Sequence, residues 1–156
     1  MKRTVYIETS IPSFYHETRK DAISVAWRAV TRSWWNGQRH FYQLVTSDVV
    51  RVELEEGKHP RQRNKIELIS ALEILDYVPI IDEIADVYIR NKLVPAETGG
   101  DAYHLAFASY YAVDFLLTWN CSHLANPNKF GHIRAVNERL RLPTPILCTP
   151  EQLLSE

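Results

Sequence analysis

Short runs of β-branched and aromatic residues alternate with stretches of helical periodicity along almost the whole chain of 156 residues. The short runs predict strands over residues 4–7, 41–46, 75–81, 115–118 and 145–148. Apolar residues spaced three and four apart, with capping residues and glycine or proline stops, predict helices over residues 23–34, 48–56, 60–72, 82–93, 101–112 and 130–140. Strands that alternate with helices favour an α/β fold, in which a mainly parallel sheet of about five strands has helices on both faces.

The length of the chain fits one domain, because single domains commonly have about 100 to 200 residues. We expect residues 1–150 to form this domain and residues 151–156 to be a C-terminal tail. Hydrophobic residues make up 46% and charged residues 24% of the sequence, which excludes a disordered chain and a coiled coil. No glycine-rich phosphate-binding motif is present, and its absence disfavours an α/β enzyme that acts on a small molecule.

The cysteines and the apolar segments indicate where the protein resides. Cys121 and Cys148 form no Cys-x-x-Cys pair, so we expect free thiols rather than a zinc site. No apolar stretch approaches the ~18 residues of a membrane span, and the N-terminal apolar run is too short for a signal peptide. The sequence therefore predicts a cytoplasmic protein that does not enter a membrane.

The net charge of -1 hides an uneven distribution along the chain. Residues 1–65 contain 12 Lys and Arg against 7 Asp and Glu, whereas residues 66–156 contain 6 against 12. Chance scatter is the simpler explanation of these counts alone. The split nevertheless suits a protein that has a basic surface and an acidic site in one domain.

Four oxygen-bearing side chains follow the predicted strands. Glu8 comes directly after the first strand, and Asn120 lies two residues past the fourth. Glu53 lies about one and a half turns into the helix after the second strand, and Asp101 begins a helix. The carboxyl ends of parallel strands share one edge of the sheet, where α/β proteins bind their ligands. Carboxylates gathered there would repel one another unless a hard cation such as Mg²⁺ or Mn²⁺ stabilised them.

Taken singly, each of these residues is better explained by an ordinary structural role. Glu8 can be a strand-end charge, Glu53 can belong to a solvated acidic face, Asp101 is a good helix N-cap and Asn120 a good turn former. Asp114 is different, because it begins the fourth strand. We therefore expect Asp114 at the opposite edge of the sheet, away from any metal.

Together, four segments resemble the acidic segments of PIN-domain ribonucleases in order and spacing. They are residues 5–10, 47–54, 101–108 and 114–120, and the likeness extends over nearly the whole chain. Many PIN-domain proteins are VapC-type toxins of type II toxin–antitoxin pairs. The resemblance implies a metal-dependent endoribonuclease that cleaves RNA, forms a homodimer, and is inhibited by a small antitoxin bound in the same cleft.

The resemblance also implies roles for individual residues. Glu8, Glu53 and Asp101 would contact Mg²⁺ or Mn²⁺ directly or through water, and Asn120 would orient a water molecule, while Thr118 and Ser10 would support the site. Glu8 stands where the family usually has Asp, and Asn120 stands where it usually has a fourth acid. These two departures favour an alternative, a catalytically weak or silent PIN-fold module that binds RNA or a protein partner.

Basic and aromatic residues suggest how RNA would bind. A solvated face explains most of the basic residues, but some are candidates for holding RNA phosphates: Arg19, Lys20, Arg39, Lys58, Arg61 and Arg63. Trp34, Trp35 and Trp119 could stack on unpaired bases. Trp27 and Trp34 fit a core-facing helix stripe better, whereas Trp35 lies off that stripe and is expected to be exposed. His104 and His123 lie near the acidic residues, and the sequence assigns neither of them a catalytic role.

Overall fold

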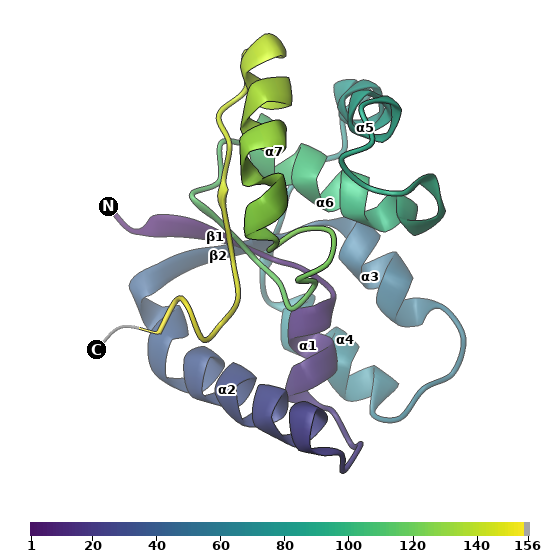
Figure 1. Cartoon of the computed structure of the whole chain (residues 1–156). Helices are drawn as coiled ribbons and strands as arrows, with labels where there is room; N and C mark the ends of the chain where they lie inside the picture. Colours follow the sequence, from purple (N-terminus) through teal and green to yellow (C-terminus); the bar gives the residue numbers. More distant parts are fainter. Residues whose placement is uncertain (155–156) are drawn as a thin grey trace.

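One parallel sheet of five strands organises residues 1–154, the part of the chain that the structure, a computed structural model, describes (Figure 1). Residues 155–156 lie outside the described part. The strands are β1 (Arg3–Ile7), β2 (Tyr42–Thr46), β3 (Glu73–Ile74), β4 (Phe115–Leu117) and β5 (Ile146–Cys148), in the spatial order β3-β2-β1-β4-β5. All four strand pairings are parallel. The predicted parallel α/β fold is therefore confirmed.

Within residues 1–154, seven α-helices and two short 3₁₀ turns connect the strands: α1 (Ser10–Tyr15), α2 (Ala22–Gln38), η1 (Arg39–Phe41), α3 (Asp48–Glu55), α4 (Gln62–Ser70), α5 (Ile80–Arg90), η2 (Ala96–Thr98), α6 (Gly99–Tyr110) and α7 (Pro127–Arg139). In Figure 1, α1, α2 and α4 lie on one side of the sheet, and α5, α6 and α7 lie on the other. Helix α3 packs against both α4 and α6, so it joins the two layers beside the end of the sheet.

The central strands are buried on both faces. In β1, Val5, Tyr6 and Ile7 have no solvent exposure, and neither do Leu116 and Leu117 of β4. Continuous apolar runs of this kind are typical of parallel strands covered by helices on both sides. The buried runs end at Ile7 and Leu117, and the predicted site residues Glu8 and Asn120 follow these strand ends in the sequence.

Two predicted elements are wrong in their bounds. Residues 75–81 do not form the third strand. That strand is β3, two residues long, because after the N–H of Leu75 bonds to the carbonyl of Thr46 the chain turns into α5. Pro79, which has no N–H for a strand ladder, is the N-cap of α5 in place of Asp82. The segment from Ser10, which reads as a break in the sequence, forms the short helix α1.

The expected exposure of Trp35 is also wrong. Trp35 is only 2% exposed, because α1 packs against α2 and brings the ring of Tyr15 edge-on to the indole at 6.3 Å. Trp34 is fully buried as predicted, whereas Ile23, in the first turn of α2, is 63% exposed. The unpredicted helix α1 therefore accounts for the wider buried face of α2.

Among residues 1–154, no helix is long and apolar enough to cross a membrane. Cys121 is exposed and Cys148 is buried, and both are free thiols, as expected. The predicted tail, residues 151–156, is described as far as Leu154, and Leu153 packs against the core. Residues 155–156 of this tail lie outside the described residues.

Candidate active site

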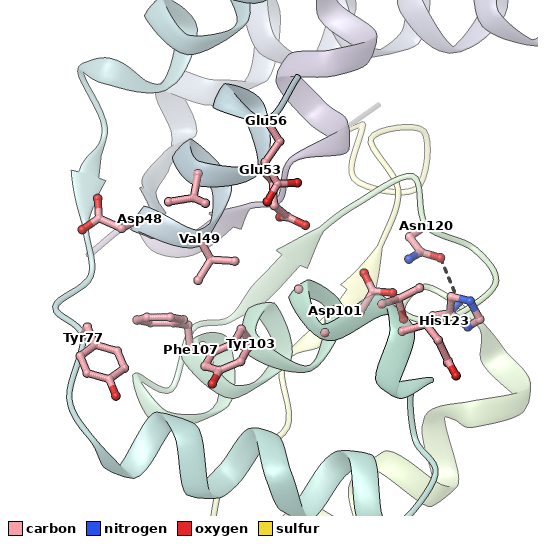
Figure 2. Close-up of a pocket in the computed structure, with 15 residues that line it drawn as sticks. Asp48, Val49, Glu53, Glu56, Tyr77, Asp101, Tyr103, Phe107, Asn120 and His123 are labelled. Carbon is pink, nitrogen blue, oxygen red and sulfur yellow. Dashed lines mark hydrogen bonds between the residues drawn. The ribbon is translucent and has the colours of Figure 1, made fainter. Parts of the chain in front are cut away.

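A cavity of about 820 Å³ opens beside α3 and α6, at the carboxyl edge of the sheet (Figure 2). Glu53 reaches it from α3, Asp101 from the first turn of α6, and Asn120 from the segment after β4. Three of the four predicted site residues therefore line one cavity, although they are up to 67 positions apart in the sequence. Glu8 is not among the lining residues.

Glu8 is buried at the end of β1, with 6% of its surface exposed. Its Oε2 accepts the backbone N–H of Ser10 at 3.0 Å, and its Oε1 accepts the hydroxyl of Ser10 at 2.6 Å and also that of Thr118. Ser10 and Thr118 were the predicted supporting residues, and the contacts of both with this carboxylate are present. Three donors therefore hold Glu8 in place between the ends of β1 and β4.

Glu53 is held through one oxygen and crowded at the other. Its Oε1 accepts hydrogen bonds from Thr9 Oγ1 and His104 Nε2, both at 2.6 Å. Its Oε2 lies over Gly100, so close that a Cβ at position 100 would be 2.3 Å away. The Gly100 backbone is therefore part of the socket in which this carboxylate sits.

His104 is the residue that sequence reasoning missed. It is fully buried on α6, one turn after Asp101, and its Nδ1 lies 2.8 Å from the hydroxyl of Tyr6. Tyr6 in turn lies 2.7 Å from Ser47 Oγ. Because a carboxylate can only accept, Nε2 of His104 must donate to Glu53. The signal for this role is the spacing of three between Asp101 and His104, which places both side chains near one face of α6.

The pKa values of these groups show how the buried charges are balanced. Burial alone lowers the pKa of His104, but the hydrogen bond to Glu53 and the charges of Glu8, Glu53 and Asp101 raise it above its ordinary value. Burial alone raises the pKa of Glu53, but His104 and the Thr9 hydroxyl hold it below its ordinary value. When His104 is protonated, its charge offsets part of the repulsion among the carboxylates from within the protein.

Asn120 is held by the chain that follows it. Its Oδ1 accepts the backbone N–H of His123 at 2.9 Å (Figure 2). The backbone N–H of Asn120 donates to Thr118 Oγ1 at 2.9 Å. Asp114, as predicted, lies at the other edge of the sheet, where its carboxylate accepts the backbone N–H of Thr4. The prediction that Asp101 begins a helix is wrong by two residues. Helix α6 starts at Gly99, and Asp101 lies in its first turn.

The rest of the cavity wall combines apolar and acidic side chains. Figure 2 shows Val49 and the rings of Tyr77, Tyr103 and Phe107 on the side away from Asn120. The acidic side chains that join Glu53 and Asp101 in the lining are Asp48, Glu56 and Glu97. The cavity therefore suits a ligand or partner with both apolar and basic groups.

The donor chemistry of the site suits a hard cation, because Glu53, Asp101 and Asn120 offer only oxygen and amide groups. Within residues 1–154, however, no group of three or more His, Cys, Asp or Glu side chains is close enough to hold a metal ion. Glu53 and Asp101 remain the cavity-lining carboxylates, and Glu8 stands behind them with its oxygens already hydrogen-bonded. The assignment of a metal to Glu8, Glu53 and Asp101 stays a prediction.

The fold places the basic residues predicted to bind RNA in separate regions and buries one of the aromatic candidates. Arg19 and Lys20 lie between α1 and α2, whereas Arg39 lies at the far end of α2, about 25 Å along that helix, with its guanidinium over Trp35. The candidates between α3 and α4, and at the start of α4, are Lys58, Arg61 and Arg63. Trp119 is buried and stacked on the ring of Trp27 at 4.5 Å, so its predicted stacking on RNA bases is wrong.

Comparisons with known proteins bear on the fold. No family model matches the chain, and no curated protein matches it. The solved complex VapBC2 of Rickettsia felis, bound to a DNA fragment from its promoter, contains a chain similar to this one, with a TM-score of 0.50 and 16% identity. The alignment covers 94% of this chain and 98% of that one. The fold is PIN-like. At 16% identity, the similarity between the two chains extends to the fold alone.

Proposed function

We propose that this protein is a metal-dependent endoribonuclease and the toxin of a toxin–antitoxin pair. The observation that carries the proposal is the meeting of Glu53, Asp101 and Asn120 around one cavity at the carboxyl edge of a PIN-like sheet. These residues come from three separate elements, and the fold brings them to the edge where α/β proteins act on their ligands.

Under this proposal, Glu53 and Asp101 bind Mg²⁺ or Mn²⁺, and Glu8 contributes through a water molecule or through its negative charge. The bound ion would polarise the scissile phosphate and lower the pKa of a water molecule. Thr118 and Ser10 hold Glu8 in its orientation by donating to it. Asn120, with its oxygen bonded to the His123 backbone, has its amide N–H groups available to orient a water or a phosphate oxygen.

The partner proposal rests on the shape and charge of the same cavity. Its apolar and acidic lining residues suit an amphipathic segment of a small antitoxin that places a basic side chain beside Glu53 and Asp101. VapBC2, the similar solved structure, is a two-component complex bound to promoter DNA. We extend that arrangement, together with a homodimeric toxin that acts in the cytoplasm, to this protein.

Two observations favour a second candidate, a silent PIN-fold module that binds RNA or protein without cleaving. Glu8 is fully engaged by hydrogen bonds, and no three-carboxylate group forms among residues 1–154. This module would bind its ligand in the same cavity, and adding a metal would produce no cleavage.

Incubation of the purified protein with a pool of structured RNAs distinguishes the two functions. The proposal predicts cleavage with Mg²⁺ or Mn²⁺ that disappears with EDTA and falls at least about 100-fold in Glu53→Gln, since even residues behind a metal ligand are worth ~10–100-fold. RNA binding without any metal-dependent cleavage would establish the silent module. Cleavage that persists in Glu53→Gln would come from a contaminant or from another site.

A further inference from the structure

A second cavity, of about 350 Å³, lies on the other side of Glu53 from the candidate active site. Its walls come from the segment between α1 and α2 and from the segment between α3 and α4. The side chains that give it polar character are Thr9, Ser13, Glu17, Thr18, Arg19, Glu53, His59 and Lys65. Glu53 lines both cavities, so the two spaces meet at one carboxylate.

Lys65 is the unusual feature of this cavity. It projects from the first turns of α4, and only 6% of its surface is exposed, although it carries an ammonium group. Its Nζ lies 3.1 Å from Nδ1 of His59. Nε2 of His59 lies 2.9 Å from the carbonyl oxygen of Leu54, which can only accept, so Nε2 carries the proton and Nδ1 accepts from Lys65.

An ammonium has three N–H donors, and His59 accepts one of them. Within residues 1–154, the other two have no hydrogen-bond acceptor. Burial lowers the pKa of Lys65, with Glu17 and Arg19 acting in opposite directions. A nearly buried cation with two unused donors, facing a cavity, can donate to the acceptor oxygens of a ligand.

The charges around the cavity favour an anion as that ligand. Glu17 faces Lys65, but the guanidinium of Arg19 forms an ion pair with Glu17 at the rim. Glu53 is already bonded to Thr9 and to His104. Burial lowers the pKa of His16 at the end of α1, and the charges of Arg61, Arg32 and Lys65 lower it further. Lys65 and the terminal nitrogens of Arg19 therefore have donors left for a bound anion.

We infer that this cavity is a phosphate-binding site, in which the Lys65 ammonium and the hydroxyl of Thr18 hold a phosphate group. The site lies next to Glu53, so an RNA strand with one phosphate at the candidate active site would place a neighbouring phosphate here. This RNA reading rests on the proposed ribonuclease function. A free phosphate group offers the same chemistry, and the experiment separates the two sources.

The test measures binding without cleavage, in EDTA, with a fluorescein-labelled single-stranded RNA decamer of mixed sequence. Lys65→Met removes the charge while keeping the length of the side chain, and Thr18→Asp adds a negative charge at the exposed rim without disturbing the core. Lys2→Met and Ser33→Asp are matched controls, because they make the same charge changes at exposed positions away from this cavity. A second titration, with inorganic phosphate, follows the backbone amide NMR signals of residues 13–19 and 59–65.

The inference predicts that Lys65→Met and Thr18→Asp weaken RNA binding about fivefold or more, while both controls stay within about twofold. Loss of one phosphate contact should also reduce the slope of log affinity against log salt by about 0.7 in Lys65→Met. If wild type binds no RNA but inorganic phosphate shifts the cavity signals, and Thr18→Asp abolishes the shift, the site holds free phosphate and the RNA function fails. Unchanged RNA and phosphate binding in both cavity variants would overturn the inference.

Discussion

Replacement of Gly100 by alanine tests the socket of Glu53 most sharply. A Cβ at this position would lie 2.3 Å from Glu53 Oε2, whereas ordinary contacts begin at about 3.4 Å, so the carboxylate would have to move by about 1 Å. Its Oε1 is held at 2.6 Å by both Thr9 and His104. The carboxylate cannot move this far and keep both hydrogen bonds. Gly99 is a matched control on the same turn of α6, because a Cβ there meets nothing within 4 Å.

The two substitutions should therefore have opposite effects on stability. Gly99→Ala should stabilise the protein by about 0.5–1 kcal/mol, because glycine is a poor helix former. Gly100→Ala gains the same stability from the better helix propensity of alanine, but it loses a hydrogen bond to a charged group, worth ~1.5–3 kcal/mol. We expect Gly100→Ala to be about 1.5–3 kcal/mol less stable than Gly99→Ala.

Urea unfolding followed by circular dichroism measures this difference, provided that the slope m is the same for both variants. RNA cleavage is measured in parallel, and we expect activity to fall in Gly100→Ala and to persist in Gly99→Ala. Equal stability of the two variants, within about 0.5 kcal/mol, would refute the reasoning, because it would mean that nothing fixes the Glu53 carboxylate against α6.

Three further predictions concern the buried polar network behind the site. Tyr6→Phe removes a hydroxyl that contacts both Ser47 and His104 in the core, and it should cost about 1–3 kcal/mol in urea unfolding; no loss would show that the two partners find other bonds. The pKa of His104 is raised in the folded protein, so its contribution to stability is complete below about pH 6.5 and is lost as the pH rises through the raised value. The unfolding free energy of wild type minus that of His104→Gln should therefore shrink as the pH rises, and a constant difference would contradict a charged His104. Thr118→Val keeps the shape of the side chain but removes a donor to Glu8, and it should lower stability by about 1–3 kcal/mol, as measured by the urea midpoint; an unchanged midpoint would show that Ser10 alone holds Glu8.

The sequence predicted the fold because the fold depends on local patterns. Apolar runs and helical spacing define β1, β2, β4 and β5, and parallel strands then send Glu8 and Asn120 to one edge and Asp114 to the other. This topological argument needs only the direction of each strand. It is also why Glu53 and Asp101, far apart in sequence, could be expected in one place.

The parts that could not be predicted depend on packing between distant elements. The spacing of His104 from Asp101 is visible in the sequence, but its contacts with Tyr6 and Glu53 require β1, α3 and α6 to meet. The burial of Lys65 depends on α4 packing against α1. A lysine near the start of an amphipathic helix looks solvated until the neighbouring helix is in place.

RNA cleavage by a matched pair of Asp→Asn variants tests the proposed function most directly. Asp101→Asn removes a carboxylate from the cavity, whereas Asp114→Asn makes the same change at the opposite edge, where an amide oxygen can still accept the N–H of Thr4. With Mn²⁺ present, the account predicts that wild type and Asp114→Asn cleave RNA alike and that Asp101→Asn is at least about 100-fold slower. Equal cleavage by Asp101→Asn and wild type would contradict the account.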